Sequence, residues 1–139
     1  MPEPQDVPTT QIGLDHAHQL ITCGRTAAEE LGLCAVFAVL DTGANLVAFA
    51  RMDRAWLASN DLAVAKARTS VTFQAPSEAL NTPLQLNQPV PHFDHLNGGL
   101  LLMAGGLPIL DDAGQLIGAI GVSGGTPEQD AEIARAALS

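Results

Sequence analysis

Apolar residues near the start of the chain recur at spacings of three and four, the period of one face of an α-helix. This face consists of Leu14, Ala17, Ile21, Gly24, Ala28 and Leu31. Gly32 follows it, and glycine is the residue that most readily adopts the left-handed conformation just beyond a helix end. The pattern therefore predicts a helix over residues 14–31.

Short apolar runs bounded by turn residues predict strands. The first two runs are residues 34–40 and 46–51, and the turn between them is Asp-Thr-Gly-Ala-Asn. This spacing predicts a β-hairpin with a loop longer than two residues. Further runs predict strands at residues 98–104, 107–110 and 115–122. The glycines of the last run indicate that a neighbour or ligand approaches its backbone closely.

Two more helices are expected. Ser59, Asn60 and Asp61 supply capping side chains for an alanine-rich helix that ends before Pro76, and the many alanines indicate that something packs close against it. The last helix begins at Thr126 with a proline at its first position and a capping box. Residues 81–97 have little periodicity, and a long irregular stretch inside a compact domain is usually functional or mobile.

The order of these elements predicts an α+β fold: a central, mostly antiparallel sheet of about five strands with helices packed against it. We expect one domain over residues 10–139, preceded by a flexible arm at residues 1–9. No internal repeat is evident in the sequence. A chain of 139 residues buries roughly two-thirds of its unfolded surface, so it can form a core without metal or disulfide crosslinks.

Composition narrows the class of protein. Hydrophobic residues make up 47% and charged residues 15%, which excludes a disordered chain and indicates that some surface is buried between subunits. A net charge of −9 disfavours nucleic acid as a partner. The sequence shows neither a secretory signal nor an apolar stretch of membrane-spanning length. Cys23 and Cys34 fit a reducing compartment, so we expect a cytoplasmic protein.

Three segments resemble the GlcG/HbpS family, which includes the C-terminal domain of PduO. The first runs from Val-Leu-Asp-Thr-Gly at residues 39–43 to Arg-Met-Asp at 51–53, and the second is Ala-Lys-Ala-Arg-Thr at 65–69. The third joins Gly-Gly-Leu-Pro-Ile at 105–109, Gly-Ala-Ile-Gly-Val-Ser-Gly-Gly at 118–125 and Glu-Gln-Asp at 128–130. This chain departs from the family pattern at Ala44 and Arg54, where the family usually has glycine.

The resemblance implies an α+β fold and a homo-oligomer built from dimers, up to an octamer. It also implies association with haem or a corrinoid in some members, whereas other members are linked to small-molecule catabolism. Several activities ascribed to the family, including haem degradation and adenosyl transfer, rest on genetic context or on a neighbouring domain.

The turn formed by Ser123, Gly124 and Gly125 is one candidate ligand site. A glycine pair before a helix frees backbone N–H groups, and the helix dipole adds partial positive charge, which suits a carboxylate or a phosphate. The alternative is a tight turn whose cap is satisfied within the chain.

Lys66 is the only lysine in the chain and lies among alanines in the second predicted helix. It is a candidate to bind an anion or to act in catalysis, unless its stem only reaches past apolar neighbours to solvent. Arg51 and Asp53, with Arg54 and Arg68, are expected to gather around it and hold a carboxylate such as a haem propionate. Arg51 and Asp53 could instead form a plain surface ion pair.

Histidines are the candidate metal ligands and proton carriers. His92 and His95 flank Phe-Asp in the irregular stretch, where imidazole can bind iron or a divalent metal or act as a general base. The alternative is two solvent-exposed loop histidines. His18 borders the apolar stripe of the first predicted helix and is a third candidate ligand for haem iron.

Two functions from different classes follow. The first is a binding protein for haem or a related tetrapyrrole, with a histidine on the iron and cations on the propionates. The alternative is an enzyme acting on a small carboxylic acid, in which Arg51 or Lys66 holds the carboxylate and His92 or His95 moves protons. The resemblance places the binding protein first.

Overall fold

The computed structural model describes residues 11–79 and 98–139, which form three helices and four strands. In chain order the elements are α1 (Leu14–Glu30), β1 (Val36–Leu40), β2 (Leu46–Arg51), α2 (Ser59–Phe73), β3 (Gly106–Leu110), β4 (Leu116–Ser123) and α4 (Pro127–Leu138).

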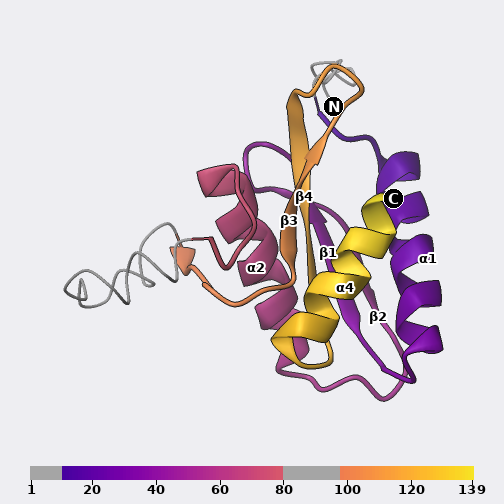
Figure 1. The fold of residues 1–139 in the computed structure, drawn as a ribbon. Coiled ribbons are helices and arrows are strands. Elements are labelled where there is room, and N and C mark those ends of the chain that lie inside the picture. The colour runs from indigo at the N-terminus through magenta and orange to yellow at the C-terminus, as the bar shows by residue number, and fades with distance from the viewer. Residues whose placement is uncertain (1–10, 80–97) are drawn as a thin grey trace, which may run out of the picture.

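The strands form one antiparallel sheet in the order β2-β1-β4-β3. Helix α2 packs on one face of the sheet, and α1 and α4 lie side by side on the other (Figure 1). The α+β class and the antiparallel sheet are therefore confirmed, but the described sheet has four strands where about five were expected.

The strand predicted at residues 98–104 is the one that does not form. Gly98 and Gly99 have φ values of 76° and 102°, which are incompatible with an extended strand. The backbone N–H of Leu101 instead donates to Thr69 Oγ1 at 2.8 Å, and Arg68 Nη1 donates to the Gly98 carbonyl at 3.3 Å. Side chains of α2 thus take the hydrogen bonds that a neighbouring strand would have made.

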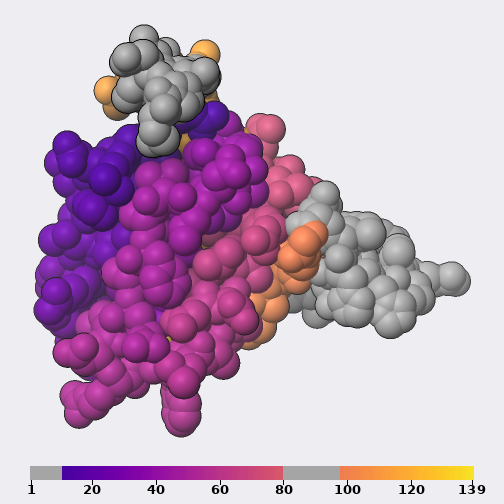
Figure 2. All heavy atoms as spheres, turned by 180° about the vertical axis from the view of Figure 1, so that it is seen from behind, coloured from indigo at the N-terminus to yellow at the C-terminus, as the bar shows by residue number. Residues whose placement is uncertain are grey.

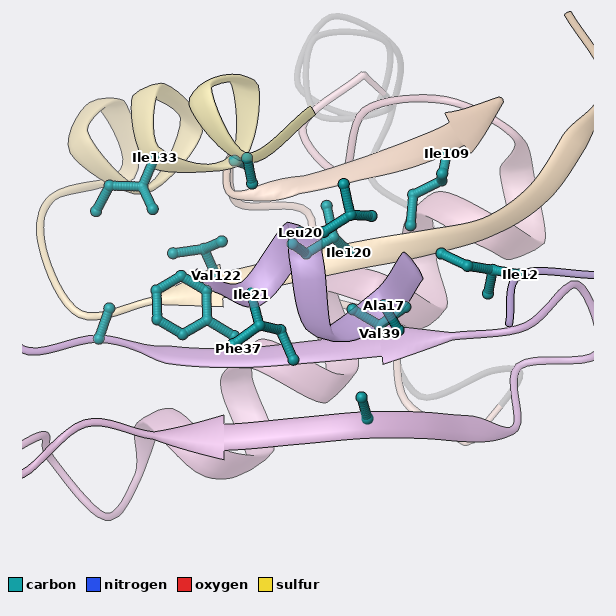
Figure 3. Packing of buried hydrophobic residues seen from close by; sticks show 14 of the residues in the cluster. Ile12, Ala17, Leu20, Ile21, Phe37, Val39, Ile109, Ile120, Val122 and Ile133 are labelled. Atoms are coloured by element: carbon teal, nitrogen blue, oxygen red, sulfur yellow. The ribbon is translucent and has the colours of Figure 1, made fainter. Parts of the chain in front are cut away.

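The core lies on both faces of the two central strands. All five residues of β1 are buried. Phe37 and Val39 belong to the larger cluster beneath α1 and α4 (Figure 3), whereas Val36 and Ala38 cluster with Ala63 of α2. This alternation is the two-residue period of a strand covered on both faces.

Glycines allow α2 to lie close against the sheet. A Cβ atom at Gly121 would overlap the carbonyl oxygen of Ala63, and one at Gly106, its partner in the β3–β4 ladder, would overlap that of Lys66. The predicted close approach to the last strand is therefore confirmed, and the neighbour is the alanine-rich helix.

The two hairpins repeat one turn, although the sequence alone had revealed no internal repeat. Asp41 Oδ1 accepts hydrogen bonds from the N–H groups two and four residues later, and Asp111 Oδ1 does the same. The fourth turn residue has positive φ in both, 62° at Ala44 and 80° at Gly114. Each hairpin also has a register shift just before its aspartate.

The helix ends agree with the sequence except at α2. Gly32 has φ 71° beyond α1, and Thr126 and Gln129 form the predicted capping box of α4. The predicted capping of α2 by Ser59, Asn60 or Asp61 is wrong, because its N-cap is Ala58, without a side-chain hydrogen bond.

Among the described residues no helix is long and apolar enough to cross a membrane.

The repeated turn gives a matched pair of stability predictions. A side chain in the left-handed region costs about 1–2 kcal/mol, so Ala44→Gly should raise the free energy of unfolding by about 1 kcal/mol. Gly114→Ala should lower it by a similar amount. Urea denaturation measures both changes, and two shifts of the same sign would contradict the common turn geometry.

Candidate ligand-binding site

Lys66 lies inside the protein and is bound within the chain. Only 1% of its surface is exposed. Its Nζ donates to Asp130 Oδ2 at 2.8 Å and to the Val122 carbonyl at 3.0 Å. The ion pair therefore joins α2 to β4 and α4, and the lysine side chain does not reach past its neighbours to solvent.

The same aspartate occupies the N–H groups of the glycine turn. Asp130 Oδ1 accepts from Gly124 N at 3.0 Å and from Gly125 N at 2.8 Å. Gln129 Oε1 accepts from Thr126 N at 2.9 Å. The backbone N–H groups that were predicted to bind a ligand anion thus already bind a carboxylate of the chain itself. This agrees with the alternative prediction, a tight turn whose cap is satisfied within the chain.

A shallow cleft of about 540 Å³, here the second cleft, lies beside this turn. Ser123 borders it and donates through Oγ to Ser59 Oγ at 3.2 Å. Its lining residues come from the start of α2, the connection before it and the β4–α4 turn: Trp56, Ala58, Ser59, Leu62, Ser123, Gly124, Gly125, Thr126 and Gln129. Among the described residues, none with a charged side chain lines it.

A separate cleft of about 510 Å³, here the first cleft, lies between α1 and the end of β2. Its exposed lining is mostly charged: Arg25, Glu29, Arg51, Asp53 and Arg54. Its buried and half-buried lining is mostly apolar: Ile21, Leu33, Cys34, Phe37, Ala50 and Met52. This cleft therefore combines a charged rim with an apolar wall.

The first cleft gathers half of the cationic side chains of the chain. Lysine and arginine number six, and Arg25, Arg51 and Arg54 line the cleft. Arg25 Nε also forms an exposed ion pair with Glu29 Oε1 at 3.0 Å. Glu29 and Asp53 line the same cleft, so three arginines against two carboxylates leave it with one net positive charge in a chain whose net charge is −9, which makes it a local site for anions.

The prediction that Arg51, Asp53, Arg54 and Arg68 gather around Lys66 is thus only partly right. Arg51, Asp53 and Arg54 lie together at the first cleft as expected. Lys66 is buried with Asp130, and Arg68 contacts Gly98, so neither lines that cleft. The predicted ligand residues therefore divide between the two clefts and the buried pair.

The candidate metal ligands are placed only in part. His18 is exposed on α1, three and seven residues before Ile21 and Arg25, so it lies on the side of the helix that borders the first cleft. His92 and His95 lie outside the described residues. Within residues 11–79 and 98–139 no group of three His, Cys, Asp or Glu side chains could hold a metal ion. Cys23 and Cys34 are free thiols there.

The family described as "Haem degrading protein HbpS-like" matches residues 12–139. This chain belongs to the HbpS-like family. An uncharacterized 15.0 kDa protein from the dhaT-dhaS intergenic region of Citrobacter freundii is 33% identical over 128 residues, covering 91% of this chain and 89% of that protein. The corrinoid adenosyltransferase PduO of the same organism is 30% identical over 133 residues, covering 95% of this chain but only 39% of PduO.

Solved structures agree with the HbpS-like assignment. Protein ORFY of Klebsiella pneumoniae has a TM-score of 0.85 at 34% identity, covering 99% of this chain and 94% of that chain. PduOC in a complex with heme has a TM-score of 0.84 at 30% identity, covering 92% and 93%. A double mutant of HbpS from Streptomyces reticuli has a TM-score of 0.84 at 29% identity, covering 99% and 94%.

Sequence reasoning missed two site residues of this HbpS-like chain, Asp130 and Arg25. Asp130 stands at the head of a buried stripe of α4 that continues with Ile133, Ala134 and Ala137. A carboxylate on an apolar stripe needs a buried partner, and that signal was available in the sequence. Arg25 lies four residues after Ile21 on the same side of α1, but only the packing of β2 shows that a cleft lies beside it.

The buried pair can be tested against an exposed one. Asp130→Asn keeps an oxygen for the Gly124 and Gly125 N–H groups but leaves the Lys66 charge without an anionic partner. We expect the free energy of unfolding to fall by about 3–5 kcal/mol, and the double variant Lys66→Met/Asp130→Asn to lose less.

The control is Glu29→Gln, which breaks the exposed pair with Arg25 and should cost at most about 0.5 kcal/mol. Urea denaturation measures all three variants. Equal small losses for Asp130→Asn and Glu29→Gln would show that the buried pair does not hold the elements together.

Proposed function

We propose that this HbpS-like protein binds haem or a related tetrapyrrole at the first cleft, as a cytoplasmic homo-oligomer. The observation that carries the proposal is the gathering of Arg25, Arg51 and Arg54 around an apolar wall in an acidic chain. A cationic cleft of this kind raises the local concentration of anionic ligands.

The two parts of the cleft correspond to the two parts of haem. The apolar wall of Ile21, Leu33 and Phe37 suits a macrocycle, and guanidinium groups at the rim suit the propionates at one edge of it. The side chains around a corrinoid ring are mostly neutral amides, so the three arginines favour haem over a corrinoid. A cleft of about 510 Å³ is within the range of small-molecule sites.

Relatives support the same ligand class. PduOC, which shares 30% identity with this chain, has been solved in a complex with heme, and the matched family is described as haem-degrading. The corrinoid adenosyltransferase activity named for PduO belongs to a protein of which this chain covers 39%, so it supports a corrinoid less directly.

His18 is the iron ligand that the described residues favour. It precedes Arg25 by seven residues on α1, so the Cα atoms of the two residues lie about 10 Å apart along the helix axis. A macrocycle lying along α1 with its propionates toward Arg25 would bring its iron toward His18. His92 and His95, outside the described residues, remain the other proposed ligands of iron or of a divalent metal.

Binding is favoured over acid–base catalysis. A catalytic Lys66 would have to leave Asp130 and the Val122 carbonyl, to which its ammonium group donates inside the protein. Arg51 and Arg54 need no such rearrangement, because both are exposed, and the pair of Arg25 with Glu29 is itself exposed to solvent. The homo-oligomer, built from dimers and up to an octamer, is consistent with a charged-residue content of only 15%.

Charge removal at the cleft tests the proposal. Arg51→Gln should raise the Kd for haem roughly tenfold or more, because a hydrogen bond to a charged group contributes about 1.5–3 kcal/mol. The control Arg135→Gln makes the same change in net charge on an exposed residue of α4 and should leave the Kd unchanged.

Absorption titrations with haem and with its dimethyl ester measure the effect. The ester has no free propionates, so Arg51→Gln and the wild type should bind it equally. An equal loss for Arg51→Gln and Arg135→Gln, or no saturable binding by the wild type, would refute the proposal.

Arg54 offers a second test, because its backbone is strained. It has φ 67°, a conformation that costs a non-glycine residue about 1–2 kcal/mol. Arg54→Gly should therefore raise the free energy of unfolding by about 1 kcal/mol and weaken haem binding at the same time.

The matched control is Gln74→Gly at the end of α2, where φ is 52° and the residue does not line the first cleft. It should gain stability without any change in haem affinity. Thermal unfolding and the haem titration give the two readouts, and wild-type affinity in Arg54→Gly would exclude Arg54 from the site.

A further inference from the structure

The connection between β2 and α2 exposes large apolar side chains at one end of the molecule. Trp56, the only tryptophan in the sequence, is 77% exposed, and Leu57 is 71% exposed. In Figure 2 the purple-magenta segment that joins these two elements projects from the lower edge of the body. Contiguous apolar groups that project in this way usually mark an interaction site.

The second cleft lies directly beside this projection. Trp56 and Leu62 form part of its wall, and the backbone of Gly124 and Gly125 forms another part. The N–H groups of both glycines donate to Asp130, so they are not available to a ligand anion. The rest of the described lining combines apolar side chains with uncharged polar ones, so it suits an aromatic or apolar side chain rather than a charged small molecule.

The charges around the projection and the cleft are complementary. Arg54 is exposed two residues before Trp56. Asp61 and Glu128 are exposed in the first turns of α2 and α4, which begin beside the second cleft. Asp53, which precedes Arg54, is also exposed, so Arg54 is the group of the projection that can pair with the negative charges near the border of the hollow.

We infer that this surface joins two copies of the chain. Trp56 and Leu57 of one copy lie against the second cleft of another, and the reverse contact forms across a twofold axis. Because the projection and the hollow belong to one surface patch, the contact is self-complementary, as an isologous interface requires. The opposite charges of Arg54 and of Asp61 with Glu128 favour a second copy over an unrelated apolar partner.

The inference rests on the proposed homo-oligomer but not on haem binding. It adds the surface that mediates assembly. Asp53 and Arg54 of the same connection line the first cleft, so assembly would bring the partner next to the rim of the proposed ligand site.

Sedimentation velocity of the full chain tests the surface. The double variant Trp56→Ser/Leu57→Ser should form a smaller assembly than the wild type at equal concentration. Leu14→Ser is the control, because Leu14 is also an exposed leucine, at 54%, but begins α1 and does not line the second cleft. It should keep the wild-type size, and circular dichroism should show that all variants fold.

The fluorescence of Trp56 gives an independent readout, because the chain has no other tryptophan and no tyrosine. In the assembled wild type we expect blue-shifted emission and protection from iodide quenching, and both should be lost on dilution to the smaller species. A solvent-exposed Trp56 in the assembled protein, or an unchanged assembly in the double variant, would show that this surface does not join the copies, while the proposed homo-oligomer would still stand. A wild type that is monomeric at all concentrations would overturn both.

Discussion

The buried contact between Lys66 and Asp130 fixes the relation of α2, β4 and α4, the elements that meet beside the second cleft. Lys66 comes from α2 on one face of the sheet and Asp130 from α4 on the other, and they meet beside the end of β4. Each carboxylate oxygen has a separate function: Oδ2 accepts from the lysine, and Oδ1 accepts from the two glycine N–H groups. One interaction therefore neutralises the lysine, satisfies the turn and holds the start of α4.

This arrangement leaves the ligand chemistry to the surface arginines. An isolated charge inside a protein is so costly that Lys66 and Asp130 must remain together, and neither is free to serve a ligand. The arginines at the first cleft carry no such constraint, and they face an apolar wall formed by α1, β1 and the edge strand β2. The strained backbone at Arg54 and the apolar projection at Trp56 belong to the same connection between β2 and α2, so ligand binding and assembly meet in one short segment.

Periodicity and turn chemistry predicted most of the fold because they act locally. The stripe of α1, the capping box of α4 and the first hairpin are each encoded within a few neighbouring residues. The strand expected at residues 98–104 failed because its hydrogen-bond partners, Thr69 and Arg68, lie about thirty residues away and are side chains rather than a strand. The sequence predicted several residues of the site but not how they group in space. Arg51 and Asp53 were correctly expected together. The separation of Lys66 from them depends on which face of the sheet α2 covers.

The central claim is that a tetrapyrrole binds along α1 with its carboxylates at the arginines and its iron at a histidine. A haem titration of wild type, His18→Ala, His92→Ala and His95→Ala, followed by visible absorption, tests it most directly. We predict saturation at one haem per subunit and a shifted Soret band that is lost in His18→Ala and retained in the other two variants. Weak, non-saturable binding that none of the three substitutions changes would contradict the account.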